Sequence, residues 1–210
     1  MKARFESAMA SLPLVAILRG LKRAEAPAAL EALLAGGFRL IEIPLNSPDP
    51  LDSIAAMRKL APPDVLIGAG TVLSVADVGE VADAGGELIV APNMDPEVIA
   101  AAKARGLIAL PGVATPTEAF AALKAGADGL KAFPAEAMPP IVIKAWRAVI
   151  PARVPILAVG GVAPDTMAPY VKAGASGFGL GSALYRAGMS AAEIAERAKA
   201  FQAAWAALNG

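Results

Sequence analysis

Short apolar runs alternate along the whole chain with longer Ala-rich stretches that carry charged residues. The short runs predict strands, and the longer stretches predict helices, because their apolar residues recur at helical spacing. The eight predicted strands cover residues 14–19, 40–45, 66–71, 88–92, 108–112, 129–133, 156–159 and 177–180. The helix that follows each strand is predicted at residues 25–35, 51–60, 75–83, 96–105, 117–125, 140–149, 164–172 and 191–208.

Strands that alternate with helices indicate a parallel sheet. Eight such units favour an α/β fold of the closed (β/α)₈ TIM-barrel type over an open doubly wound sheet. No linker or low-complexity segment divides the sequence, so we expect one domain over residues 1–210. The active site of a barrel lies at the carboxyl ends of its strands. The polar candidates there are Arg19, Glu42, Asn46, Thr71, Asn93 and Lys131.

The charge balance argues against two classes of partner. Lys and Arg together number 19, as do Asp and Glu, so the formal net charge is zero. Nucleic acid and anionic membrane surfaces attract proteins with a basic excess, so neither is expected as a partner. Residues 1–12 lack the apolar run of a secretory signal, and no stretch reaches the roughly 18 apolar residues of a membrane span. We therefore expect a cytoplasmic protein.

Two missing residue types narrow the chemistry. The sequence contains neither Cys nor His. This excludes disulfides, thiolate catalysis, Cys metal sites and the Ser–His–Asp triad, and it removes the commonest ligand of transition metals. Acid–base catalysis must then come from Glu, Asp, Lys, Tyr or water.

Lys131 is the only Lys at the end of a predicted strand, within the run GLKAFP at residues 129–134. Burial of a Lys as a cation in such an apolar strand is costly. One interpretation is a structural Lys paired with a carboxylate. The other is a nucleophilic amine, because desolvation lowers the pKa of a Lys and leaves it neutral and reactive.

Glu42 lies in the run LIEIPLN at residues 40–46. Side chains alternate along a strand, so Leu40 and Glu42 share one face and Ile41 and Ile43 the other. The β-branched pair is expected to face the helices, which directs Glu42 into the barrel. In a sequence without His, Glu42 is the best candidate for general acid–base catalysis. The alternative is a salt bridge to Lys131 or Arg19 without proton transfer.

Two groups of residues suit the anionic ends of a small molecule. Arg19 ends the first strand, and its guanidinium fits a carboxylate, to which the Thr71 hydroxyl could also donate. The last two strands end in Gly-rich runs, which contain Gly160, Gly161, Gly181 and Ser182. Barrels often bind phosphate through backbone N–H groups of the loops after strands seven and eight.

These runs together resemble one family, the 2-keto-3-deoxy-6-phosphogluconate and -galactonate aldolases. The similar motifs are AILRG at 16–20, EIPLNS at 42–47, IGAGTV at 67–72, PN at 92–93, LKAFP at 130–134, AVGGV at 158–162 and GLGS at 179–182. The chain is closer to the galactonate branch. It has Asn46 where gluconate enzymes typically carry a phosphate-binding Arg, and Val159 where they typically carry Thr.

The resemblance implies a class I aldolase that needs no metal or organic cofactor. Lys131 would form a Schiff base with a phosphorylated 2-keto-3-deoxy sugar acid, and Glu42 would move the proton that releases glyceraldehyde 3-phosphate and then pyruvate. The carboxylate would bind to Arg19 and Thr71, the phosphate to the glycines and Ser182, and the substrate carbons would contact Phe133. Pro92 and Val159 would complete the substrate site. The family also implies a homotrimer.

Three alternatives remain open at the level of the sequence. The first is an aldolase specific for the gluconate epimer or active on both epimers. The second is a phosphate-binding barrel isomerase or synthase in which Lys131 acts as an acid–base group. The third is a binding protein without turnover, against which the presence of both Lys131 and Glu42 argues.

Overall fold

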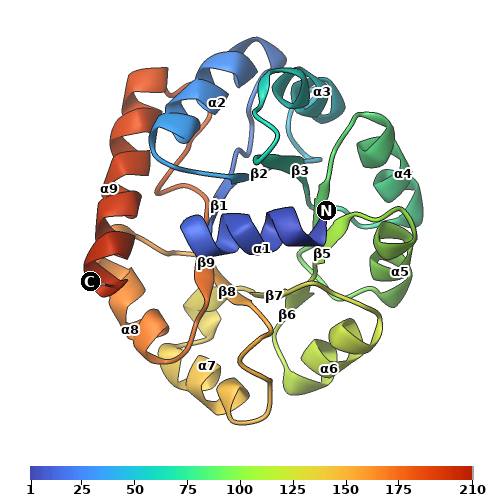
Figure 1. Cartoon of the computed structure of the whole chain (residues 1–210), viewed down its shortest axis with the longest axis vertical. Coiled ribbons are helices and arrows are strands. Elements are labelled where there is room, and N and C mark those ends of the chain that lie inside the picture. Colours follow the sequence, from blue (N-terminus) through green and yellow to red (C-terminus); the bar gives the residue numbers. More distant parts are fainter. Residues whose placement is uncertain (210) are drawn as a thin grey trace.

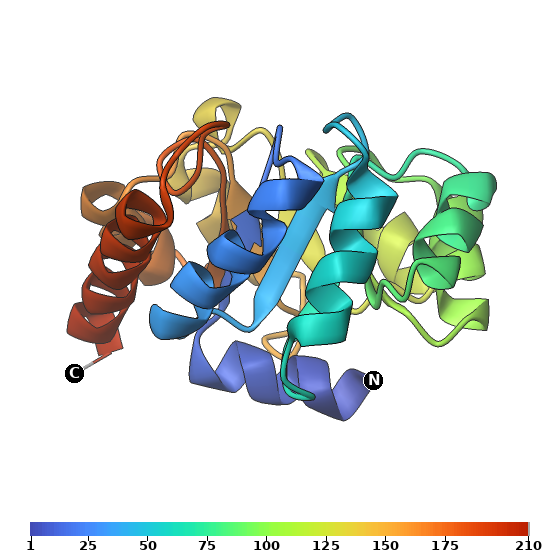
Figure 2. The same cartoon turned by 90° about the horizontal axis from the view of Figure 1, so that it is seen from above.

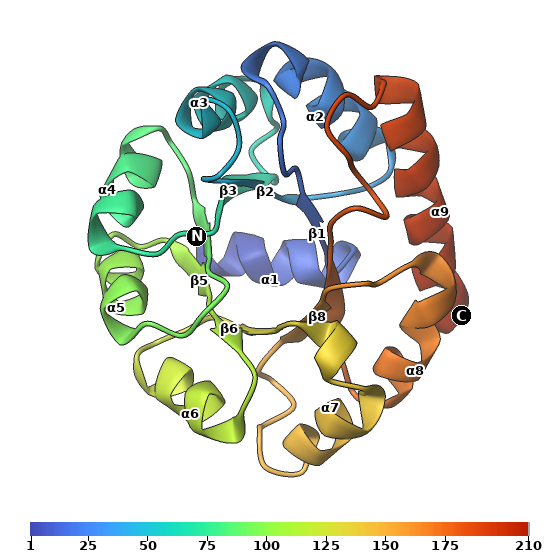
Figure 3. The ribbon, with the colours of Figure 1, turned by 180° about the vertical axis from the view of Figure 1, so that it is seen from behind.

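The computed structural model describes residues 1–209, so the last residue of the predicted 1–210 domain lies outside it. Its strands form one parallel sheet that closes into a barrel, which confirms the predicted TIM-barrel fold. Figures 1 and 3 show the ring of helices around the strands. The strands are β1 (Leu14–Ile17), β2 (Leu40–Pro44), β3 (Leu66–Gly70), β4 (Leu88–Val90), β5 (Ile108–Leu110), β6 (Gly112–Val113), β7 (Leu130–Ala132), β8 (Ile156–Val159) and β9 (Gly177–Leu180).

The fifth predicted strand is split into β5 and β6 by Pro111. A proline has no N–H to donate to a strand ladder, which interrupts the pairing at this position. β5 pairs with β4, whereas β6 pairs with β7. The Pro111 carbonyl still accepts a hydrogen bond from the Lys131 N–H at 2.9 Å. The two short strands together therefore occupy the position of one barrel strand, between β4 and β7.

All eight predicted helices are present, with ends within a few residues of the prediction. Two of them begin with a 3₁₀ turn, η1 (Arg23–Glu25) and η3 (Pro164–Thr166), and a third turn, η2 (Ala135–Ala137), follows β7. The helices of the ring are α2 (Ala26–Ala35), α3 (Pro50–Leu60), α4 (Val75–Asp83), α5 (Pro96–Ala104), α6 (Pro116–Lys124), α7 (Pro140–Arg147), α8 (Met167–Lys172) and α9 (Ala191–Asn209).

One further helix, α1 (Lys2–Ser11), was not predicted from the sequence. It crosses the amino-terminal end of the barrel (Figures 1 and 2). Phe5 and Ala8 on this helix are buried in the cluster that fills the barrel interior. Arg4 holds the helix in place through an ion pair with Glu87 at 2.5 Å. The helix thus closes the end of the barrel that is opposite to the carboxyl ends of the strands.

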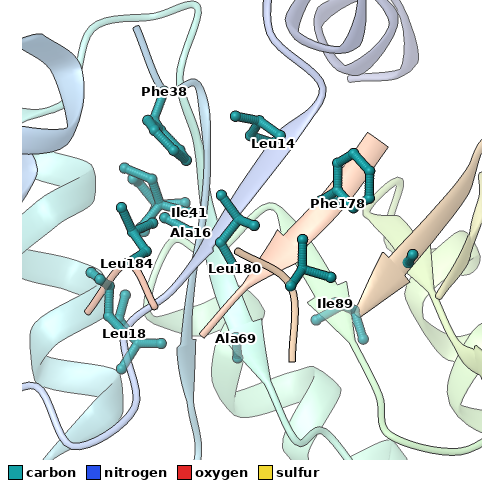
Figure 4. Close-up of a cluster of buried hydrophobic side chains, with 14 of the residues drawn as sticks. Leu14, Ala16, Leu18, Phe38, Ile41, Ala69, Ile89, Phe178, Leu180 and Leu184 are labelled. Carbon is teal, nitrogen blue, oxygen red and sulfur yellow. The ribbon is translucent and has the colours of Figure 1, made fainter. Parts of the chain in front are cut away.

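Buried apolar side chains form two layers, one on each side of the strands. The outer cluster packs the strands against the helices and includes Ile41 and Phe178 (Figure 4). Ile43 belongs to the same cluster. The inner cluster includes Leu40 and Leu157. The predicted alternation in β2 is therefore confirmed, and it places Glu42 on the interior face. No helix among residues 1–209 is long and apolar enough to cross a membrane.

Candidate active site

A cavity of about 560 Å³ opens among the carboxyl ends of the strands. This volume lies in the range of small-molecule sites. Its walls come from six regions of the sequence, which only barrel closure brings together. They are lined by Ile17, Arg19, Glu42, Thr71, Lys131, Phe133, Glu136, Val159, Gly160, Gly161, Val162, Gly181, Ser182, Ala183, Tyr185 and Arg186.

Lys131 reaches the cavity from β7. Its neighbours Leu130 and Ala132 belong to the outer cluster, so alternation turns the Lys131 side chain inward. Only 7% of Lys131 is exposed. Burial lowers the pKa of its amine below 10.5, and the charge of Arg19 lowers this pKa further, whereas that of Glu42 raises it. The amine lies 4.8 Å from the centre of the Phe133 ring. The neutral, nucleophilic form of the amine is therefore more populated at Lys131 than at an exposed Lys.

Glu42 lies in β2, with 1% of the residue exposed. A Cβ on Gly70, in the neighbouring strand β3, would collide with the Glu42 carboxylate, so the glycine leaves the room that the carboxylate occupies. Its Oε2 atom is buried without a hydrogen-bond partner. Burial raises the pKa of Glu42 to about 7, although the charges of Lys131 and Arg19 act in the opposite direction. A carboxyl group with this pKa can both accept and release a proton near neutral pH.

Glu42 and Lys131 influence each other's pKa, yet no ion pair of 4.0 Å or less joins them. A structural Lys–Glu pair would place the two charged atoms in direct contact with further hydrogen bonds around them. The observed arrangement leaves the amine and one carboxylate oxygen available to a ligand. The geometry therefore favours the catalytic interpretation of both residues over the structural one.

Thr71 follows β3 and lines the cavity with Arg19. Its φ of 57° is in the left-handed region, which a β-branched residue rarely adopts. Such strain costs of order 1–3 kcal/mol and is concentrated at functional sites. Arg19 is exposed at the end of the first strand segment, and its charge acts on both Glu42 and Lys131. The pair therefore lines the same cavity as the amine, with a guanidinium and a hydroxyl that can donate hydrogen bonds.

The Gly-rich runs form another part of the cavity wall. Gly160 and Gly161 have φ values of 119° and 63°, which other residues adopt only with strain. Gly181 is not crowded, because a Cβ built there would have no atom within 4 Å. Ser182 follows it directly and is exposed. The two runs expose backbone to the cavity at positions suited to an anionic group.

The cavity contains ten of the eleven predicted site residues. Pro92 does not line it, and its carbonyl lies against Gly112 in the neighbouring strand instead. The strand-end residues Asn46 and Asn93 are also absent from its walls. Three further polar residues of the cavity, Glu136, Tyr185 and Arg186, were not predicted from the sequence. These residues come three or more positions beyond the strand ends, where the strand pattern no longer predicts direction.

The residues that the structure describes contain no cluster of three or more acidic side chains placed to hold a metal ion. The cavity instead offers one amine, two guanidinium groups and two carboxylates. This set can bind an anionic molecule, form a covalent adduct through Lys131 and transfer a proton through Glu42.

Comparison with known proteins agrees with this chemistry. A family model described as KDPG and KHG aldolase matches residues 5–200. The chain is 54% identical over 198 residues to the probable 2-dehydro-3-deoxy-6-phosphogalactonate aldolase of Rhizobium meliloti (strain 1021), covering 94% of this chain and 93% of that protein. It is 49% identical to the 2-dehydro-3-deoxy-6-phosphogalactonate aldolase of Escherichia coli (strain K12), covering 92% and 95%. A solved native KDPGal structure superimposes with a TM-score of 0.92 at 48% identity, covering 94% and 96% of the two chains. The chain therefore belongs to the KDPG and KHG aldolase family.

Proposed function

We propose that this protein is a class I aldolase that cleaves 2-dehydro-3-deoxy-6-phosphogalactonate into pyruvate and glyceraldehyde 3-phosphate. The observation that carries the proposal is the convergence of a buried amine, Lys131, and a buried carboxyl group with an unpartnered oxygen, Glu42, in one cavity. The relatives with about half of their residues identical to this chain are named for the same reaction.

The reaction begins when the neutral amine of Lys131 attacks the C2 ketone. Loss of water gives an iminium cation, which is an electron sink for cleavage of the C3–C4 bond. Glu42, acting through a water molecule, removes the proton of the C4 hydroxyl, and glyceraldehyde 3-phosphate leaves. The remaining enamine takes up a proton at C3, and hydrolysis of the resulting iminium releases pyruvate and restores Lys131.

The two anionic ends of the substrate bind on different walls. Arg19 and the Thr71 hydroxyl hold the carboxylate beside Lys131. The backbone of Gly160, Gly161 and Gly181, together with Ser182, holds the phosphate. Phe133 packs beside the substrate carbons, close to the amine that it already contacts. This orientation keeps the phosphate contacts away from the bond that breaks.

Borohydride trapping tests the covalent step. Treatment with borohydride and pyruvate is expected to inactivate the enzyme and to label one peptide, the one that contains Lys131. Lys131→Arg is the matched variant, because a guanidinium keeps the charge but is a poor nucleophile. It should show neither label nor turnover. Label on another Lys, or turnover without any label, would remove the Schiff base from the proposal and favour an acid–base role for Lys131.

The choice between C4 epimers is expected to depend on Val159. This side chain is buried at the end of β8 and lines the cavity with methyl groups only. A hydroxyl at this position could hydrogen-bond to the C4 hydroxyl of the gluconate epimer, whereas an apolar wall discriminates weakly. We expect a higher kcat/KM for the galactonate epimer. Val159→Thr should shift the ratio toward the gluconate epimer by about 1 kcal/mol, or roughly fivefold. An unchanged ratio would show that Val159 does not set the preference.

Subunit association and location are further parts of the proposal. Large apolar side chains are exposed on three helices of the ring, at Val75 in α4, Phe120 in α6 and Ile141 in α7, and such surface is often covered by another subunit. We propose a homotrimer, to be tested by light scattering coupled to size-exclusion chromatography. A cytoplasmic location remains a prediction from the sequence.

A further inference from the structure

Two charged side chains line the cavity but have no part in the reaction steps above. Glu136 lies in the turn η2, five residues after Lys131. Arg186 lies in the segment after β9, four residues after Ser182. Both residues line the same cavity as the Gly-rich runs. Their charges are of opposite sign and are carried by different loops, so each can act on a ligand there separately.

Glu136 packs directly against the backbone of the first Gly-rich run. A Cβ on Gly160 or Gly161 would collide with the Glu136 side chain, at its carboxylate in the first case and at its Cγ in the second. The glycines therefore leave the room that the Glu136 side chain occupies. None of the ion pairs of the described residues includes Glu136. Its negative charge is therefore uncompensated beside the surface that is proposed to bind phosphate.

Arg186 is held in position by a hydrogen bond within its own segment. Its Nε donates a hydrogen bond to the Ser182 carbonyl at 3.1 Å. No carboxylate of residues 1–209 lies within ion-pair distance of its guanidinium. One edge of the guanidinium is thus fixed to the backbone beside Ser182. The terminal nitrogens keep donors that can bind a phosphate oxygen, the ligand to which an arginine is best suited.

We infer that Arg186 and Glu136 together set the selectivity for the charge at the far end of the substrate. Arg186 binds the phosphate and raises the affinity for the dianion. Glu136 repels the dianion, which lowers affinity at the same end and favours release of the phosphorylated aldehyde after cleavage. This inference rests on the proposed function, because it presupposes that the substrate ends in a phosphate.

The test compares two aldehydes in the synthesis direction, with pyruvate as the common partner. D-glyceraldehyde 3-phosphate carries the dianion, and D-glyceraldehyde lacks it. The measured quantity is the ratio of the two kcat/KM values. Arg186→Gln should lower this ratio about tenfold or more, mainly through the KM of the phosphorylated aldehyde, as expected for one charge-assisted hydrogen bond. Glu136→Gln should raise it, by roughly threefold, since the site is open to solvent.

Matched variants separate charge selectivity from a general loss of structure. Arg186→Lys keeps a positive charge and should retain part of the ratio. Arg153→Gln and Glu31→Gln change the same residue types at exposed positions outside the cavity and should leave the ratio unchanged. Inorganic phosphate serves as a second probe, because it should inhibit Glu136→Gln more strongly, and Arg186→Gln less strongly, than the parent enzyme.

The failure of this inference differs from the failure of the proposed function. If the parent enzyme forms no borohydride adduct with pyruvate and makes no aldol product, the proposed function is wrong. If the parent enzyme is active and both variants keep its ratio, the charge-selectivity inference is overturned while the aldolase stands. A fall in the ratio for Glu136→Gln would also overturn it, since Glu136 would then support phosphate binding.

Discussion

Glu42→Gln tests directly how much the buried, reactive carboxyl group of Glu42 lowers the stability of the barrel. Burial raises the pKa of Glu42 from its usual 4.5 to about 7 in the folded protein. Between these pH values the folded protein keeps a proton that the unfolded chain has released. The stabilisation from this proton is complete below pH 4.5 and is lost as the pH rises through 7.

The size of the effect follows from the two pKa values. Each pH unit that separates them corresponds to about 1.4 kcal/mol. Integration of the two titrations gives a loss of about 2.5 kcal/mol in the free energy of unfolding between pH 5 and pH 8. Gln has nearly the shape of a protonated Glu and does not titrate. The variant should therefore lie within about 1 kcal/mol of the parent at pH 5 and exceed its stability by up to about 3 kcal/mol at pH 8.

Urea unfolding at pH 5, 6, 7 and 8 measures this difference directly. Glu31→Gln on the exposed side of α2 is the control and should follow the parent at every pH. In a Lys131→Met background, the free energy of unfolding should fall more between pH 5 and pH 8, because the charge of Lys131 lowers the pKa of Glu42. A difference between the parent and Glu42→Gln that stays constant from pH 5 to pH 8 would refute the raised pKa and the reasoning built on it.

Two other predictions concern the reaction and the closed end of the barrel. The kcat/KM for cleavage should rise with pH through about 7, because Glu42 must be ionised and the lowered pKa of Lys131 acts in the same direction. A lactate dehydrogenase-coupled assay from pH 5.5 to 9 measures this, and a rate that is flat from pH 6 to 8 would contradict it. Phe5→Ala should lower the free energy of unfolding by about 3–5 kcal/mol, because the side chain is buried in the barrel interior. The kcat/KM of Phe5→Ala should change little, since α1 closes the end of the barrel opposite to the cavity. Lys2→Ala is the exposed control. If Phe5→Ala lowers the free energy of unfolding in urea by less than 1 kcal/mol, Phe5 does not hold the helix.

The repeated pattern of the sequence was sufficient to predict the barrel. A strand that is buried on both faces appears in the sequence as a continuous run of apolar residues. Each such run in this chain is followed by a stretch with helical periodicity. The division of the fifth strand at Pro111 was not predicted from the sequence. A proline interrupts a strand only where the adjacent strand needs a hydrogen bond from the missing N–H, and the sequence does not show where that is. Helix α1 was missed for a different reason. Only Phe5 and Ala8 are buried on it, which is too few for a periodic signal, and its position depends on the shape of the finished barrel.

The direction of a side chain could be predicted from the sequence where strand geometry fixes it. Alternation turned Glu42 and Lys131 inward, and both line the cavity. Pro92 was selected by its motif alone, and the structure leaves it outside the walls. Glu136 and Arg186 could not be predicted in the same way, because a loop has no fixed period. Their positions depend on how the turn η2 and the segment after β9 fold against the barrel end.

The same features that weaken this fold are those that the chemistry requires. A hydrogen-bond partner for the Glu42 Oε2 atom would stabilise the buried carboxylate, but it would also lower the pKa of Glu42 and occupy an oxygen that is otherwise available to a ligand or a water molecule. A Gly at position 71 would relieve the left-handed backbone, yet it would remove the hydroxyl proposed to bind the carboxylate. A larger residue at position 70 would stabilise the strand, but it would collide with Glu42. Stabilising changes at these three positions should therefore cost activity, whereas changes of similar size at outer-cluster residues that do not line the cavity, such as Ile41 and Phe178, are free of this conflict.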